Sequence, residues 1–178
     1  PPISTLLPYT TLFRSGSLSK VAKIVPPKSK MIPDSIVIEA ACDVNNPLYG
    51  KNGAAYIFGP QKGADPVMVE ALDQGLRHMA DRIEADLGLD VRSIPGGGAA
   101  GGLGAGVVAF LGGSLRPGIE LLLDAVHFDD MVSQADYVFT GEGRMDGQSL
   151  SGKTPVGVAM RAKKYNVPVI GVVGSLGK

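Results

Sequence analysis

The sequence predicts an α/β protein whose sheet is mostly parallel. Two observations lead to this prediction. Short apolar strand patterns alternate with stretches of helical period along the 178 residues, and many of the turns between them contain glycine. Such alternation is typical of βαβ units, in which helices cover the faces of a parallel sheet. The 25 glycines gather in these turns, which favours sites lined by backbone over disorder.

The first part of the chain contains two predicted strands and one long helix. Residues 35–42 are apolar and β-branched, and residues 54–58 form a second short strand pattern. Asp65 followed by Pro66 is typical of an N-cap and a first-turn proline. Leucine, methionine and isoleucine side chains then recur at helical spacing until Gly88, the predicted C-terminal stop.

In the second part of the chain, the predicted strands and helices follow one another at shorter intervals. Residues 89–94 resemble a strand, and residues 95–102 predict a loop entering a small-residue helix that ends near Leu111. Pro117 predicts the start of another helix. Its apolar face contains Ile119, Leu122, Leu123 and Val126. The remaining predicted elements are a connector at 131–135, a strand at 137–140, a helix at 155–165 and a closing strand at 167–173.

Composition excludes several classes of protein. Residues 1–33 contain five basic and no acidic residues, so the remainder is acidic, with 12 basic against 17 acidic residues. An acidic body with few aromatic residues argues against nucleic-acid binding. No apolar run has the roughly 18–20 residues of a membrane span. The single cysteine, Cys42, permits no disulfide framework, which suits the reducing cytoplasm.

Residues 1–15 are unlike the rest of the chain. They lack periodicity and helix caps, and residues 5–15 read TLLPYTTLFRS. We interpret this segment as a disordered tail or as translated adapter sequence joined to a coding fragment, and we leave it out of the fold prediction. Continuity of the source DNA upstream of Ser15 would contradict the second interpretation.

The run TGEGRMDGQSLSGKTP at 140–155 is the most informative in the chain. It lies between a predicted strand and a predicted helix and combines four glycines with Glu142, Arg144, Asp146 and Lys153. Glycines allow a ligand to approach the backbone, and a helix N-terminus favours anions. The run therefore predicts a phosphate-handling site. Loop ion pairs, Glu142 with Arg144 or Asp146 with Lys153, are the alternative interpretation.

Two literal motif matches fit their context poorly. Residues 147–154 match the P-loop pattern, but the strand is predicted to end near Thr140, and Pro155 removes an amide at the helix start. Residues 96–101 match the dinucleotide fingerprint GxGxxG, but Pro95 interrupts the approach to it. The acid at the expected distance, Glu120, lies in a predicted helix.

Two further segments suggest binding. Asp43, Asn45 and Asn46 follow a predicted strand, and ligands of open α/β sheets bind at the carboxyl ends of strands. Turn initiation explains Asn46 before Pro47 equally well. Lys62 lies in the turn GPQKG, where a solvated surface charge is the alternative. The two histidines are isolated in the sequence and predict no metal cluster.

Taken together, these segments resemble the bacterial-type glycerate kinase family. The resemblance runs from about Gly16 to Lys178. The matching runs, in order, are ACDVNNPL (41–48), NGAAYIFGPQKGA (52–64), IPGGGAAGGLGAGVVAFLGG (94–113), LRPGIELLLDA (115–125), TGEGRMDGQSLSGKTPVGVA (140–159) and PVIGVVGSL (168–176). Two residues depart mildly from the family pattern, Gly97 and Thr154, and alanine is usual at both positions.

The resemblance implies a kinase that transfers the γ-phosphoryl group of ATP to glycerate, with Mg²⁺ as the metal. Phosphorylation at either hydroxyl of glycerate is compatible with it. The implied catalytic residues are Asp43, Asp146, Arg144 and Lys153, with both aspartates open to the role of base or Mg²⁺ ligand. The implied substrate- and phosphate-binding residues are Asn45, Asn46, Lys62, Gly96, Gly98, Gly101, Gly102, Glu142 and Gln148.

The resemblance also implies the domain organisation. The family combines a flavodoxin-like domain with an inserted second α/β domain. We expect residues 16–126 to be part of the inserted domain and residues 127–178 a C-terminal piece of the flavodoxin-like domain. The family's N-terminal segment and its extreme C-terminal part have no counterpart here, so we expect a fragment with an incomplete site. A non-catalytic α/β piece and a P-loop nucleotide-binding protein are the alternatives.

Overall fold

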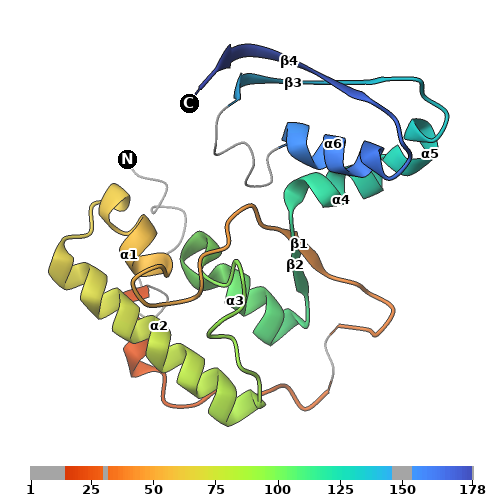
Figure 1. Ribbon diagram of the computed structural model, residues 1–178. Helices are drawn as coiled ribbons and strands as arrows, with labels where there is room; N and C mark the ends of the chain where they lie inside the picture. Colours follow the sequence, from red (N-terminus) through yellow and green to blue (C-terminus); the bar gives the residue numbers. More distant parts are fainter. Residues whose placement is uncertain (1–14, 30–31, 146–153, 178) are drawn as a thin grey trace, which may run out of the picture. The chain divides into compact units, whose positions relative to one another are not determined.

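The protein has a mixed helix and strand architecture (Figure 1). The computed structural model describes residues 15–29, 32–145 and 154–177. Within them, strands β1 (Glu39–Ala41) and β2 (Ser114–Arg116) pair with each other, and β3 (Val138–Met145) pairs with β4 (Val169–Leu176). This confirms the predicted α/β class.

The chain divides into two compact units. The first comprises residues 1–40 and 44–115, and the second comprises residues 41–43 and 116–178. Assignment of residues 16–126 and 127–178 to the two domains of the family stays a prediction. Among the described helices, none combines the length and the apolar character that crossing a membrane requires.

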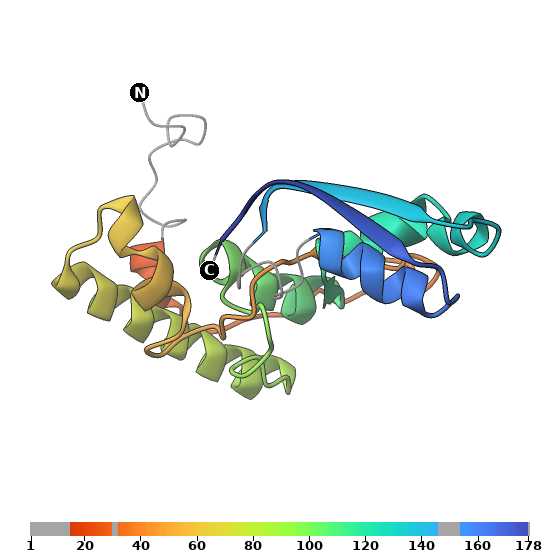
Figure 2. The ribbon, with the colours of Figure 1, turned by 45° about the horizontal axis from the view of Figure 1, so that its top comes forward.

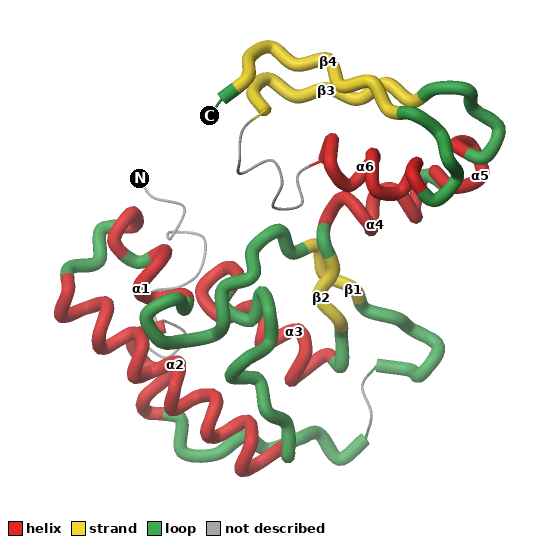
Figure 3. The backbone as a smooth tube through the Cα atoms, in the orientation of Figure 1, coloured by secondary structure: helices red, strands yellow, loops and turns green. Residues whose placement is uncertain are grey.

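The first unit is built from helices, as the tube in Figure 3 shows. They are the 3₁₀ helices η3 (Ser15–Lys20) and η4 (Pro60–Lys62), and the α-helices α1 (Ala54–Phe58), α2 (Pro66–Leu87) and α3 (Ala99–Leu111). The side chain of Asp65 accepts a hydrogen bond of 2.8 Å from the Met68 amide, and Gly88 ends α2 in a left-handed conformation. Both predicted caps of α2 are confirmed. The core consists of Leu48, Ala54, Ala55, Val69, Leu76, Ala80, Ile83, Val91 and Ala105.

Two predicted elements of the first unit are wrong, and a third is shorter than predicted. Residues 54–58 form helix α1 instead of a strand, because the small side chains of Ala54 and Ala55 are buried in the core. The strand predicted at 35–42 shrinks to β1, which pairs with the unpredicted strand β2. Residues 89–94 contain no strand, since the Asp90 carboxylate accepts a hydrogen bond of 3.0 Å from the Arg92 amide and closes a turn.

The second unit places helices against a parallel pair of strands. In β3 and β4 the pairing runs from Val138 opposite Val169 to Met145 opposite Leu176, which confirms a parallel arrangement for these strands. The helices are α4 (Gly118–Ala125), α5 (Phe128–Val132) and α6 (Thr154–Lys163). Figures 1 and 2 both show α6 lying along one side of the β3–β4 pair.

A small core joins the helices of the second unit. Ile119 and Leu123 of α4 pack against Val158 of α6. A Cβ on Gly157 would lie 2.6 Å from Cγ1 of Ile119, so glycine permits the close approach of α6 to α4. Two other residues of the predicted apolar face, Leu122 and Val126, are exposed, which corrects that part of the prediction. The buried face of α4 is narrower than predicted because one pair of side chains at positions i and i+4, Ile119 and Leu123, makes the contact with α6.

The strand predicted at 137–140 is too short. β3 continues to Met145 and includes residues that were predicted to form a loop. Its backbone pairs with β4 along its length, and the Gly177 amide donates a hydrogen bond of 2.7 Å to the Met145 carbonyl. The glycines that suggested a loop are compatible with a strand because the partner strand supplies the hydrogen bonds. The predicted connector at 131–135 also overlaps helix α5.

Candidate functional site

The glycine-rich segment before α3 is fitted closely against the loop that follows Asn46. The amide of Gly98 donates a hydrogen bond of 3.0 Å to the Asn46 carbonyl, and both Gly96 and Gly98 are buried. A Cβ on Gly98 would collide with the carbonyl oxygen of Pro47. Glycine at this position is therefore a requirement of the close approach between the two segments.

The first turn of α3 has an unusual backbone. Ala100, Gly101 and Gly102 all adopt left-handed conformations, with φ of 51°, 75° and 101°. A left-handed residue other than glycine carries a cost of about 1–2 kcal/mol. Consecutive residues of this kind interrupt the regular pattern of helical hydrogen bonds and turn backbone amides toward new partners. Turns of successive amides are common cradles for anions.

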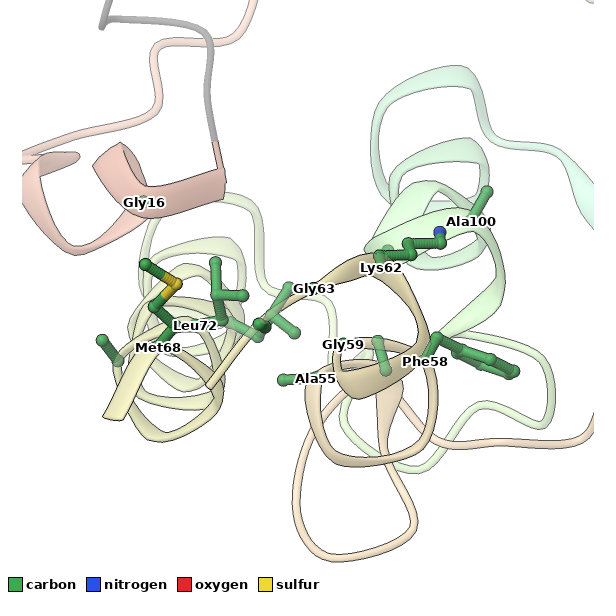
Figure 4. A pocket seen from close by; sticks show the side chains of 14 residues that line it. Gly16, Ala55, Phe58, Gly59, Lys62, Gly63, Met68, Leu72 and Ala100 are labelled. Atoms are coloured by element: carbon green, nitrogen blue, oxygen red, sulfur yellow. The ribbon is translucent and has the colours of Figure 1, made fainter. Parts of the chain in front are cut away.

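A cavity of about 500 Å³ lies beside this turn (Figure 4). Its size is within the range of small-molecule sites. Lys62 is the one charged side chain among the described residues that line it, and Figure 4 shows Lys62 beside Ala100. The apolar lining includes Ala55, Phe58, Met68, Leu72 and Leu76. The cavity thus offers a single cation in apolar surroundings, which suits a small anionic ligand.

The two predicted asparagines differ in their environment. The Asn46 side-chain amide donates a hydrogen bond of 2.9 Å to the Asn52 carbonyl, and its own carbonyl accepts from Gly98. Asn46 therefore holds the loop together, which is the turn role that the sequence left open. Asn45 is exposed.

Asp43 follows β1, as predicted, and contacts the start of α4. Its Oδ1 accepts a hydrogen bond of 2.8 Å from the Gly118 amide, the first residue of that helix. The carboxylate is exposed. A negative charge at this place is favoured by the unpaired amides and the dipole of a helix N-terminus.

The remaining predicted residues belong to the glycine-rich run after Tyr137. Glu142 and Arg144 are part of β3, where they lie opposite Val173 and Ser175 of β4. Glu142 is half-buried and Arg144 is exposed. Asp146, Gln148 and Lys153 lie outside the described residues.

The structure groups the predicted residues in two sets. The first unit contains Asn45, Asn46, Lys62, Gly96, Gly98, Gly101 and Gly102, and the second contains Asp43, Glu142 and Arg144. Within the first set, Asn46 bonds to Gly98, while Lys62 and Gly101 line one cavity. Among the described residues, no three histidine, cysteine, aspartate or glutamate side chains gather closely enough to hold a metal ion.

An arginine that sequence reasoning missed organises the second unit. Arg161 of α6 donates to Asp129 at 2.7 Å and to Glu120 at 2.5 Å, and it also contacts Asp124. Hydrogen bonds from Arg116 and then Arg161 lower the pKa of Asp124, and the hydrogen bond from Arg161 lowers the pKa of Asp129. No local sequence pattern predicts this cluster, because its members come from three helices.

Asp73 is the second residue that was missed. It is a carboxylate buried in α2, one helical turn after the core residue Val69. The signal was present in the sequence, since a charged residue interrupts an otherwise apolar face of the helix. Such a residue is seldom buried without a partner.

Comparison with known proteins agrees with the sequence motifs. The sequence model of the glycerate kinase family matches residues 10–178. The chain is 52% identical to a glycerate kinase of Halalkalibacterium halodurans and 49% identical to the glycerate 2-kinase of Escherichia coli K12. Each alignment covers 92% of this chain and 43% of the relative.

A solved structure gives the same result. The crystal structure of a candidate glycerate kinase 2 from Salmonella typhimurium LT2 superposes with a TM-score of 0.71 at 56% identity. The match covers 78% of this chain and 37% of the Salmonella chain. The chain thus spans less than half the length of these relatives. The match to the family over nearly all its residues shows that the chain belongs to the glycerate kinase family.

Proposed function

We propose that this chain is part of a phosphotransferase that moves the γ-phosphoryl group of ATP to a hydroxyl of glycerate. The observation that supports this most strongly is the identity of 49–52% with proteins named glycerate kinase and glycerate 2-kinase. The cavity beside Lys62 supports it independently, because glycerate is a small anion and the cavity places one cation in apolar surroundings.

Positioning and charge neutralisation dominate phosphoryl transfer. In our proposal Lys62 and the turn at Gly101 and Gly102 bind an anionic group, a carboxylate or a phosphate, while Gly98, whose amide donates to the Asn46 carbonyl, holds this turn in place. Arg144 and Lys153 counter further negative charge, arginine as a planar fork and lysine as a point charge. Asp43 or Asp146 accepts the proton of the attacking hydroxyl.

The chemistry of the described residues is compatible with Mg²⁺, although they provide no cluster of three ligands. Magnesium in kinases is bound through one or two carboxylates, water and the phosphates of the nucleotide. Asp43 is an exposed carboxylate that would serve as such a ligand. The ion would neutralise charge on the phosphates. We also propose a cytoplasmic location, for which the single free cysteine is the support.

The proposal is tested by incubating the purified chain with ATP, Mg²⁺ and D-glycerate. ADP release measures turnover, and ³¹P NMR identifies which hydroxyl is phosphorylated. The E. coli glycerate 2-kinase serves as the positive control. Isothermal titration with glycerate and with Mg·ATP separates binding from catalysis. A chain that binds neither compound contradicts the proposal, and binding without turnover supports the non-catalytic alternative.

A P-loop nucleotide site is the second candidate, and one observation favours it. β3 ends at Met145 and α6 begins at Thr154, so residues 147–154 connect a strand to a helix in the order that a P-loop requires. Pro155 still removes an amide near the helix start. This alternative predicts that Lys153→Met abolishes ATP binding while glycerate binding is unchanged.

A further inference from the structure

Asp73 has the most unusual environment of any charged residue that the structure describes. It is 2% exposed, and burial of an ionised carboxylate is costly unless hydrogen bonds compensate it. Both of its oxygens have partners. Oδ1 accepts a hydrogen bond of 2.6 Å from the Gly50 amide, and Oδ2 accepts one of 3.0 Å from Nε of Arg77. A helix residue therefore binds the backbone of a loop 23 positions away.

Arg77 extends the same contact to the neighbouring loop residue. It lies one turn after Asp73 in α2, and its guanidinium lies over the ring of Tyr49 at 4.4 Å from the ring centre. Two side chains one turn apart on α2 thus hold two consecutive loop residues, Tyr49 and Gly50. Gly50 has a φ of 90°, a conformation that other residues seldom adopt. We call Asp73, Arg77, Tyr49 and Gly50 the α2 clamp.

The clamped turn is connected to the glycine-rich segment by a short series of hydrogen bonds. The Gly53 amide donates to Gly50 at 2.8 Å, and the Ala54 amide donates to Leu48 at 3.2 Å. Asn46, at the start of the same loop, accepts from Gly98 at 3.0 Å.

The loop also lies close to Gly98. A Cβ at Gly98 would lie 3.2 Å from the Ala54 amide nitrogen and 3.1 Å from the Asn46 carbonyl, so the space between the two segments leaves no room for a side chain. These contacts are the route by which a shift of the turn at Gly50 would reach Gly98.

We propose that Asp73 is a positioning residue for the anion site, by which we mean the cavity lined by Ala54, Lys62 and Gly101. Through the α2 clamp Asp73 sets the place of residues 46–54 and, through them, of Gly98 at the start of α3. The identity of the ligand, glycerate, rests on the proposed function. Asp73 itself contacts only the loop and Arg77 in the hydrogen bonds described above. It acts through the loop backbone.

The test compares Asp73→Ala, Asp73→Asn and the control Asp81→Ala. Asp81 is in the same helix and also forms an ion pair, with Arg92, but its side chain is 65% exposed. Hydrogen exchange at the Gly50 and Gly98 amides measures loop position without any ligand. Glycerate affinity, by titration, measures the site.

We expect exchange at Gly50 and Gly98 to rise about tenfold in Asp73→Ala, because local opening becomes easier while the rest of α2 stays protected. We expect glycerate affinity to fall about tenfold to a hundredfold, as a small displacement at a binding site can produce. Asparagine retains an acceptor for the Gly50 amide and should restore both quantities to within about threefold of wild type. The Asp81→Ala variant should match wild type.

Arg77→Gln provides the test if Asp73→Ala does not fold. Arg77 is half exposed, so its replacement removes no apolar core side chain, while it takes away the Tyr49 contact and the hydrogen bond to Oδ2 of Asp73. We expect hydrogen exchange at the Gly98 amide to rise in this variant too, but by less than in Asp73→Ala. Unchanged exchange at Gly98 in the folded variants would overturn the inference. So would unchanged affinity with exchange raised equally throughout the first unit.

Failure of the proposed function gives a different result. If the wild-type chain binds no glycerate, the assigned ligand is wrong. The exchange at Gly98 then decides by itself whether Asp73 positions the loop: a rise confined to residues 46–54 and Gly98 supports the inference, and no rise overturns it.

Discussion

The amide of Gly118 lies 2.8 Å from Oδ1 of Asp43, although the two residues are 75 positions apart in the sequence. The aspartate that we propose as a base or Mg²⁺ ligand therefore also satisfies the first amide of α4. A carboxylate that accepts a hydrogen bond at a helix N-terminus is restrained in position. The structural and the chemical roles of Asp43 can be separated by substitution, because only the second requires a charge.

The first prediction separates these roles. Asp43→Asn retains the acceptor for Gly118 and should leave the free energy of unfolding within about 0.5 kcal/mol of wild type, while Asp43→Ala should lower it by about 1 kcal/mol. If Asp43 is the base or a metal ligand, both variants should reduce phosphoryl transfer at least a hundredfold. Urea unfolding and ADP release measure the two effects. Full activity in Asp43→Asn would assign Asp43 a capping role alone.

The second prediction concerns the cavity cation. Lys62→Gln should weaken binding of the anionic ligand about tenfold to a hundredfold, since a hydrogen bond to a charged group contributes about 1.5–3 kcal/mol. Lys51→Gln is the matched control, because Lys51 is an exposed lysine of the same unit that is not part of the described cavity lining. Titration calorimetry with glycerate and with Mg·ATP identifies which ligand depends on Lys62. Equal, small effects of both substitutions would mean that Lys62 is a solvated surface charge.

The third prediction tests the contact between the glycine-rich segment and the loop. Gly98→Ala should lower the free energy of unfolding by about 1–3 kcal/mol, because the added methyl group collides with the Pro47 carbonyl. Gly106→Ala, in the same helix, should instead raise it by about 0.5–1 kcal/mol, since its Cβ would be 3.9 Å from Phe110 and alanine favours helix. Thermal and urea unfolding give both values. A Gly98→Ala variant as stable as wild type would show that the loop has room to move.

The fourth prediction concerns acid stability of the second unit. Hydrogen bonds from Arg116 and Arg161 lower the folded-state pKa of Asp124, and the hydrogen bond from Arg161 lowers that of Asp129. A lowered folded pKa contributes stability that is present above the unfolded pKa of about 3.9 and is lost as pH falls through the folded value. The free energy of unfolding should therefore decrease as pH falls below about 4.

Arg161→Gln should make this decrease shallower and should lower the stability near neutral pH. Arg92→Gln is the control, because Arg92 also contacts three carboxylates, but they are more exposed and such pairs contribute little. Urea unfolding from pH 7 to pH 2.5, followed by circular dichroism, measures the slope for each protein. An unchanged slope in Arg161→Gln would show that its carboxylate partners are not coupled to folding.

The local signals in the sequence were reliable where neighbouring residues decide the structure. Asp65, Pro66 and Gly88 located both ends of α2, because caps depend on residues within one turn. Pro117 located the start of α4 for the same reason. The family was also determined by the sequence, since its motifs follow one another in a fixed order from residue 41 to residue 176.

The sequence-based predictions of secondary structure failed where contacts with residues distant in the sequence outweigh the local preference. Ala54 to Phe58 have a strand-like pattern, yet core packing makes them a helix. Glycines 141 and 143 suggested a loop, yet pairing with β4 extends the strand to Met145. In both segments the local preference is weak and the energy of packing or of interstrand hydrogen bonds is larger.

The sequence by itself determined the α/β class, the caps of α2, the family and the set of candidate residues. Only the tertiary structure decided that Asn46 bonds to Gly98, that Lys62 lines a cavity with Gly101, and that Asp43 meets the start of α4. It also revealed Asp73 and Arg161, whose partners come from other elements of the chain. The physical reason is that a buried or paired charge is stabilised by groups distant in sequence, and no local pattern encodes where folding will bring them.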